Sequence, residues 1–162
     1  GPYRASVYYA YDRFSAAPEI RDALNSGTLV VSNRYVSANM GHQAGKIADP
    51  VERERFLVWL KELEYEVLGI PKPDMNILLY VTPEMGQQLV DKKLERAYTQ
   101  GKKRDIHEAD IAHLRSASQA YLEVANKEGW KIISSMKGES DLRSKEEVHE
   151  EIYAYLKEQG VI

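Results

Sequence analysis

The chain has 162 residues, which suits one domain, since a single hydrophobic core stops growing at roughly 250 residues. Hydrophobic residues make up 43% of it and charged residues 29%, the net charge is −3, and cysteine is absent. This composition is typical of a soluble globular domain and excludes disulfide scaffolds, thiolate metal sites and a cysteine nucleophile. Without a membrane-length apolar run, a signal-peptide pattern or a global basic field, we expect a cytoplasmic protein with neither a membrane nor a nucleic-acid partner.

Apolar spacing and turn residues predict the elements along the chain. The apolar periodicity at the start favours a helix with a break or kink near Pro18, because proline removes a backbone donor. Continuous β-prone runs such as TLVVS and NILLYV are typical of parallel strands buried on both faces. The predicted order is helix 5–25, strand 28–32, helices 37–47 and 51–68, strand 76–81, a helix from 82–84 onward, a basic stretch at 91–104, helix 106–128, strand 131–134 and helix 144–158. Strands that alternate with helices predict a three-layer α/β/α domain with a parallel sheet.

Cap residues mark the starts of three of these helices. Asp49-Pro50 and Thr82-Pro83 each place a side-chain acceptor before a first-turn proline, and Ser144 with Glu147 forms a capping-box pattern. The helix after Pro50 should bury one apolar stripe. The predicted stripe is Phe56, Leu57, Leu60, Leu63, Tyr65 and Val67.

Two arginines stand near the expected ligand-binding edge of the sheet. Ligands of such domains bind beyond the carboxyl ends of parallel strands, where Arg34 is expected to lie. A guanidinium there, with that of Arg13, suits a phosphate or a planar base edge. Tyr9 lies one helical turn before Arg13 and offers an aromatic platform. The competing interpretation is a surface pair of Arg13 with a neighbouring carboxylate, with Arg34 lying along the surface.

Amide side chains follow the first predicted strand end. Asn39 and Gln43 carry the paired donors and acceptors that read a base edge. The histidines farther along the chain lack the spacing of a metal site.

The basic stretch is the largest local departure from the composition of the chain. Residues 91–104 carry a net charge of +4, which leaves −7 for the rest. Such a run is either a solvated face or a loop that closes over a polyphosphate, with Gly101 allowing the bend. A nucleic-acid-binding loop is a third interpretation, and the salt dependence of DNA titrations would test it.

Three sequence blocks resemble the thymidylate kinase family of P-loop nucleoside monophosphate kinases. VYYAYDRF (7–14) is similar to an aromatic-x-x-x-Arg helix of that family, and VSNRYVSANMGHQ (31–43) to its D-R-Y-V-x-S-N-x-A-Y-Q strand end. The third block runs from Pro73-Asp74 to the basic stretch and is similar to the family's P-D strand and lid. The resemblance covers nearly the whole chain and implies phosphoryl transfer from ATP to dTMP with Mg²⁺, by a homodimer.

The resemblance also implies roles for individual residues. Tyr9 would stack on thymine, Arg13 would contact the edge of the base, and Arg34 would hold the acceptor phosphate. Asn39 would read the base, and the substrate site would continue to His42 and Gln43, with His42 at a position that helps to reject a ribose 2′-hydroxyl. A lid over residues 91–105 would stabilise the transferring phosphoryl group. Its implied cations are Arg96, Lys102, Lys103 and Arg104.

The chain departs from the family pattern at Asn33, at Ala38, where the family has serine, at His42, where it has tyrosine or phenylalanine, and at its start. Asn33 stands where the family has an aspartate that supports Mg²⁺, so any metal contact there comes from a neutral amide. The family's strand–P-loop–helix portion, with its G-x-x-x-x-G-K-[ST] motif, has no counterpart in the 162 residues. We therefore expect residues 1–162 to be one N-terminally incomplete thymidylate kinase-like domain, inactive in transfer by itself. The alternatives are another deoxynucleotide or nucleoside kinase, or a non-catalytic nucleotide-binding scaffold.

Overall fold

A computed structural model describes residues 1–95, 111–138 and 140–162 of the chain. The helices are α1 (Pro2–Asn25), α2 (Val36–His42), the 3-10 turn η1 (Ala44–Lys46), α3 (Pro50–Lys61), the π-helical segment η2 (Glu62–Val67), α4 (Pro83–Glu95), α5 (Ile111–Glu128) and α6 (Lys145–Glu158). The strands are β1 (Ile77–Tyr80), β2 (Lys131–Ser134), β3 (Met136–Lys137) and β4 (Asp141–Leu142). None of the described helices is both long enough and apolar enough to span a bilayer.

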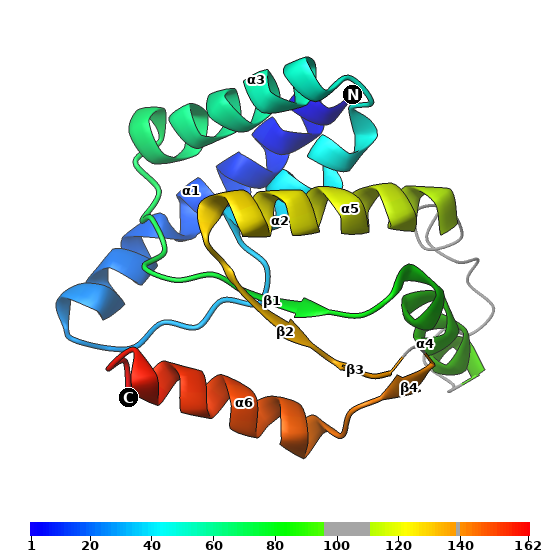
Figure 1. The fold of residues 1–162 in the computed structure, drawn as a ribbon. Coiled ribbons are helices and arrows are strands. Elements are labelled where there is room, and N and C mark those ends of the chain that lie inside the picture. The colour runs from blue at the N-terminus through cyan, green and yellow to red at the C-terminus, as the bar shows by residue number, and fades with distance from the viewer. Residues whose placement is uncertain (96–110, 139) are drawn as a thin grey trace. The chain divides into compact units, whose positions relative to one another are not determined.

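The chain divides into two compact units. The first holds Gly1–Asn76 and Ser116–Val124, and the second holds Ile77–Arg115 and Ala125–Ile162. The middle of α5 therefore packs with the N-terminal helices of the first unit (Figure 1).

The first unit is a helical cluster whose members touch along small and apolar side chains. α1 contacts α2 and η2, and α2 contacts α3. Gly45 lets η1 approach α5 closely, because a Cβ there would lie 2.9 Å from the Cα of Ala117. Tyr3 packs against Phe56 and Trp59, with ring centroids 5.1 and 4.7 Å apart, so this tyrosine is a packing residue. The buried hydrophobic residues of this unit are Ala10, Ala17, Val36, Met40, Ala44, Ile47, Phe56, Leu57, Leu60, Ile70, Ala117, Ala120 and Val124.

Of the break or kink expected near Pro18, the break does not occur, since α1 continues through this proline to Asn25. Pro18 removes one backbone donor, but burial of Ala10 and Ala17 on the same helix holds the segment against its neighbours. The helix ends where the positive φ of Gly27, 78°, reverses the chain.

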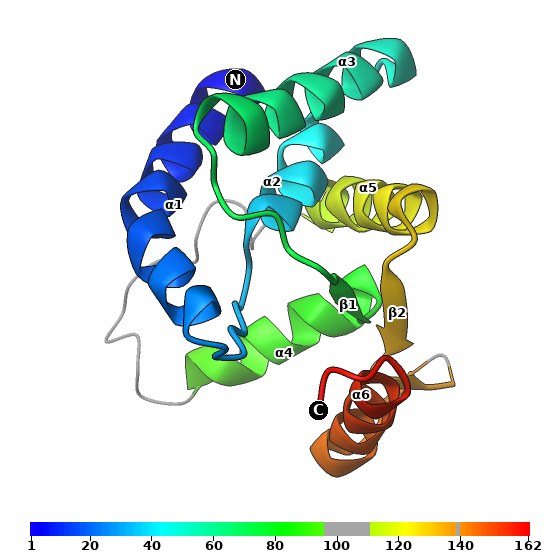
Figure 2. The same cartoon turned by 90° about the vertical axis from the view of Figure 1, so that its left-hand side faces the viewer.

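The predicted strand at 28–32 is wrong. The segment forms no ladder with any described residue and runs as an irregular trace between α1 and α2 (Figure 2). Its apolar side chains are exposed, Val31 to 83%. A β-prone run becomes a strand only when a neighbouring strand takes up its N–H and C=O groups.

The helix after Asp49 forms as predicted, but its buried stripe differs. Asp49 Oδ1 accepts hydrogen bonds from the backbone of Val51 and Glu52 at 2.7 and 3.0 Å, which caps α3. Phe56, Leu57 and Leu60 are buried as predicted, whereas Val67 is 69% exposed and Glu64 is fully buried. The π-helical segment η2 adds a residue to the last turn, which rotates the residues that follow it.

The second unit is built on a parallel pair of strands. β1 pairs with β2 from Ile77↔Lys131 to Tyr80↔Ser134, so both strands lie where the sequence predicts them. The pair is not buried on both faces as expected, since Leu79 is 51% exposed. β3 and β4 form a short antiparallel pair, and α6 packs against β2 (Figure 2). Helices and a parallel pair make this an α/β chain.

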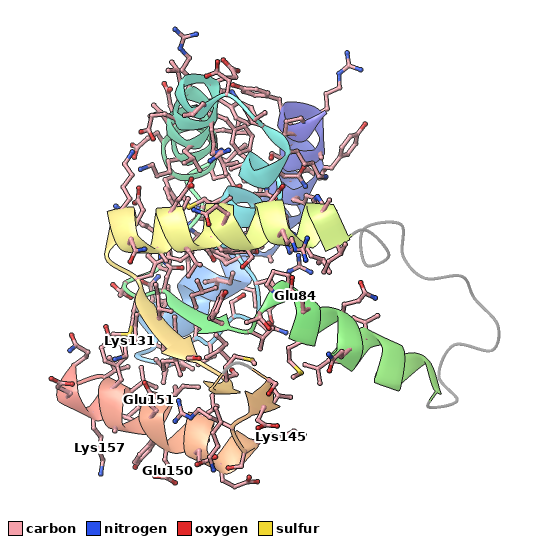
Figure 3. The ribbon with its side chains drawn as sticks, turned by 45° about the vertical axis from the view of Figure 1, so that its right-hand side comes forward. Glu84, Lys131, Lys145, Glu150, Glu151 and Lys157 are labelled. Atoms are coloured by element: carbon pink, nitrogen blue, oxygen red, sulfur yellow. The ribbon has the colours of Figure 1, made fainter. Side chains whose placement is uncertain are left out.

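Side chains at the ends of the helices explain where α4 and α6 begin. Thr82 Oγ1 accepts from the Met85 backbone at 3.3 Å, and Ser144 and Glu147 form the predicted capping box. Backbone hydrogen bonding, chiefly to Ser144, lowers the pKa of Glu147. Figure 3 shows charged side chains along the outer side of α6, including Lys145, Glu150 and Lys157. This face of α6 is solvated, and we assign no site to it.

Candidate functional site

The first unit brings Arg13 against a carboxylate that is distant in sequence. Arg13 Nε and Nη2 donate to the two carboxylate oxygens of Glu64, each at 2.5 Å, and Nη1 donates to the carbonyl of Tyr35 at 3.5 Å. The side chains are 13% and 0% exposed respectively. A pair of Arg13 with a carboxylate of its own helix, the competing interpretation of the sequence, is therefore not what forms.

Arg34 lies in a bend just before α2 and has a strained backbone. Its φ is +70°, a left-handed value that residues with a Cβ adopt rarely. Ser32 Oγ donates to the Arg34 carbonyl at 2.9 Å and supports this bend. The guanidinium hydrogen-bonds the hydroxyl of Tyr121, on the part of α5 that belongs to the first unit. Strain of this kind is concentrated at functional sites, where the surrounding structure enforces it.

Tyr121 joins the Arg34 bend to α2. Its hydroxyl donates to the Ala38 carbonyl at 3.3 Å, and its ring meets the ring of His42 edge-on at 5.4 Å. The ring also covers Gly41, where a Cβ would lie 2.3 Å from it. Burial raises the pKa of Tyr121, and the charge and hydrogen bond of Arg34 offset part of that effect. The hydroxyl therefore stays protonated at neutral pH and keeps its donor role.

The two amide residues of the predicted site are buried in and after α2. Gln43 Oε1 accepts from Lys46 Nζ at 3.1 Å, so its oxygen is satisfied within the chain. Asn39 is 3% exposed, and its Nδ2 has no hydrogen-bond partner within the described part of the chain. A buried donor left without an acceptor costs about 1–3 kcal/mol, so such a group calls for an explanation, and a bound ligand is one.

Tyr9 and Asn33 remain open to solvent. Tyr9 is 53% exposed on α1, one turn before Arg13, and its ring is available to a flat ligand. Asn33 is exposed in the bend beside Arg34. Within residues 1–95, 111–138 and 140–162, no group of three or more His, Asp or Glu is arranged to hold a metal ion.

The predicted lid cations Arg96, Lys102, Lys103 and Arg104 lie outside the described residues. Their role stays a prediction.

Two residues of this region were missed from the sequence. Glu64 lies four residues after Leu60 and eight after Phe56, on the buried line of the helix, and an acidic residue at such a position requires a buried cation. That spacing was a usable signal. Nothing local marks Tyr121, because its partners come from 79–87 residues away along the chain.

The second unit has parallel strands joined by helices, as α/β nucleotide-binding proteins do. The first unit separately holds two arginines and two buried amides at or near a strained bend. Within this class, the family model "Thymidylate kinase" matches residues 1–152. The chain belongs to the thymidylate kinase family, whose fold is that of the P-loop kinases.

Curated relatives agree with this assignment. The chain is 27% identical over 128 residues to thymidylate kinase of Mycobacterium tuberculosis, which covers 79% of this chain and 58% of that protein. It is 26% identical over 155 residues to thymidylate kinase of Deinococcus radiodurans, and the match covers 95% of this chain and 67% of that protein. It is 30% identical over 141 residues to a probable thymidylate kinase of Archaeoglobus fulgidus, and the match covers 87% of this chain and 61% of that protein. The chain thus spans about three-fifths of the length of the relatives that it matches.

Proposed function

We propose that the whole protein transfers a phosphoryl group from ATP to dTMP, giving dTDP and ADP, and that residues 1–162 supply the acceptor-nucleotide side. The observation that carries this proposal is the buried, unpartnered Nδ2 of Asn39 beside the Arg34 bend, within the described part of a chain of this family. A nucleobase carbonyl is an acceptor of the kind that this group lacks.

In this proposal, different residues bind the base, the phosphate and the sugar of the nucleotide. Tyr9 stacks on thymine, Arg13 contacts its edge and Asn39 donates to it. Arg34 pairs with the phosphate, whose charge matches a guanidinium held at a strained bend. His42 borders the sugar, and Gln43, which lies between α2 and η1, completes the substrate-binding set.

Phosphoryl transfer depends on positioning and on stabilising charge, and these acceptor-side residues supply the first. The lid over residues 91–105 would supply cations to the transferring group, and ATP with Mg²⁺ would enter through the P-loop portion of a three-layer α/β/α fold. The 162 residues contain no G-x-x-x-x-G-K-[ST] motif, so we expect no transfer by them alone. The protein would act in the cytoplasm, without nucleic acid or membrane.

Substitution of Asn39 tests the proposal on the full-length protein. Asn39→Leu removes the orphan donor at similar volume, and we expect the dissociation constant for dTMP to rise roughly tenfold, since one buried hydrogen bond is lost. Isothermal titration calorimetry measures the affinity, and a coupled assay measures ATP-dependent dTDP formation. Gln119→Leu, an exposed amide on α5, is the matched control and should leave both unchanged. A wild-type protein indifferent to dTMP would refute the proposal.

A different deoxynucleotide is a second candidate substrate, because His42 replaces the aromatic residue that the family pattern has at this position. Its edge-on contact with Tyr121 places an imidazole beside the Arg34 bend. A panel of dTMP, dUMP, dCMP and thymidine decides: the nucleotide with the highest kcat/KM is the substrate.

We also propose a homodimer, for which α1 offers a surface. Val7, Tyr8, Tyr11 and Phe14 are exposed at helical spacing on this one helix. A contiguous apolar stripe of this kind is typical of a surface that a partner covers. Light scattering of the full-length protein should give twice the monomer mass, and Val7→Glu should give the monomer mass. Val58→Glu is the control: Val58 of α3 is exposed to a similar extent, and this variant should keep the dimer mass. A wild-type protein with the monomer mass would contradict the proposed dimer.

A further inference from the structure

We infer that Glu64 is a positioning residue that fixes the guanidinium of Arg13 for the nucleobase. This inference rests on the proposed function, because it assigns Arg13 to the acceptor nucleotide. Glu64 itself touches no ligand and acts through Arg13.

Arg13 of α1 and Glu64 of η2 form a bidentate ion pair that joins these two helical segments. Nε and Nη2 of Arg13 meet both oxygens of Glu64 at 2.5 Å, which fixes the plane of the guanidinium as well as its position. Nη1 adds a contact to the Tyr35 carbonyl, one residue after Arg34. Tyr35 is in turn held by its hydroxyl, which donates to the Pro71 carbonyl at 2.9 Å. Arg13 is therefore fixed relative to the bend that carries the proposed phosphate residue.

The guanidinium keeps donors for a ligand. Arginine has five N–H groups, and the contacts to Glu64 and Tyr35 occupy three of them within the described part of the chain. Arg13 is 13% exposed, so part of its side chain still reaches the surface. A base edge with two acceptors, or one acceptor and a bridging water, matches the remaining groups.

Stability alone does not account for a buried pair of this kind. Glu64 lies on the buried line of Phe56 and Leu60, where an apolar residue would fill the space without the desolvation of a carboxylate. Replacing buried ion pairs by apolar side chains of similar volume is often neutral or stabilising. The π-helical segment that holds Glu64 is a second observation in favour of a functional role, since such segments occur frequently at functional sites.

The test compares Glu64→Gln with wild type in the full-length protein. Calorimetry with dTMP and, by competition, with deoxyribose 5-phosphate separates base contacts from phosphate contacts. We expect Glu64→Gln to weaken the affinity for dTMP roughly tenfold and to leave the affinity for deoxyribose 5-phosphate unchanged. The reason is that a neutral amide cannot form the bidentate ion pair that fixes the guanidinium of Arg13. Glu123→Gln breaks another ion pair of the first unit, Arg53–Glu123 at 2.7 Å, and should change neither affinity.

A double mutant separates positioning from a structural role. If Glu64 acts through Arg13, Glu64→Gln adds no further loss of dTMP affinity in an Arg13→Ala background. Additive losses, or equal weakening of both ligands, would overturn the inference, as would wild-type dTMP affinity in Glu64→Gln. If Glu64→Gln does not fold, Glu64→Asp keeps the charge but shortens the reach, and it should show the same selective loss. A wild-type protein that fails to bind dTMP refutes the proposed function instead, and the inference with it.

Discussion

Replacing Arg34 by glycine is expected to weaken dTMP binding roughly 10- to 100-fold while leaving the free energy of unfolding within about 1 kcal/mol of wild type. The affinity falls because the charged hydrogen bonds to the proposed phosphate disappear. Calorimetry with dTMP and urea denaturation, both on the full-length protein, measure the two quantities separately.

The backbone explains why stability should survive this change. Arg34 has a φ of +70°, which costs a residue with a Cβ on the order of 1–3 kcal/mol and costs glycine almost nothing. Glycine relieves that strain and offsets the loss of the Arg34–Tyr121 hydrogen bond. Loss of dTMP affinity without loss of stability in Arg34→Gly would indicate that the strained backbone of Arg34 serves binding rather than folding.

Two further variants make the result interpretable. Arg34→Ala keeps the strained φ and loses the guanidinium, so it should bind dTMP as weakly as the glycine variant but unfold more readily. Arg55→Ala removes an arginine that is 74% exposed and 3.8 Å from Glu52, and it should match wild type in both measurements. Wild-type dTMP affinity in Arg34→Gly would exclude Arg34 from the site.

Substituting alanine for Gly41 should lower the free energy of unfolding by about 1–3 kcal/mol, the usual cost of overpacking a filled interior. A Cβ at this position would lie 2.3 Å from the ring of Tyr121, far inside van der Waals contact. The ring must therefore move, and its hydroxyl then loses the Ala38 carbonyl. Because the same hydroxyl holds Arg34, dTMP affinity should fall as well.

The control is a glycine-to-alanine substitution at Gly86, which we expect to raise the free energy of unfolding rather than lower it. Gly86 lies within α4, where, among the described residues, a Cβ would meet only Val81, at 3.7 Å. Gly86→Ala should stabilise the protein by about 0.4–1 kcal/mol, because alanine loses less backbone entropy in a helix. Combining Gly41→Ala with Tyr121→Leu should remove most of the clash, and a full additive loss in the double variant would contradict this explanation.

Local signals in the sequence were sufficient for most helices and for the parallel strands β1 and β2, but not for the short antiparallel pair of β3 and β4. The capping residues Asp49 and Ser144 act within three residues of themselves, so their effect does not depend on the rest of the fold. β1 and β2 formed because two β-prone runs exist and pair with each other. The run at 28–32 is also β-prone but has no partner strand among the described residues, and it stays irregular.

By itself the sequence pointed to Arg13, Arg34 and Asn39 and to the helices that carry Arg13 and Asn39, whereas the strand expected before Arg34 did not form. Only the tertiary structure decided what those residues touch. Arg13 meets Glu64, 51 residues away, and Arg34 meets Tyr121, 87 residues away, and neither pairing follows from local spacing. The reason is physical: secondary structure depends on neighbours along the chain, whereas a buried charge or donor requires a partner that only packing brings near.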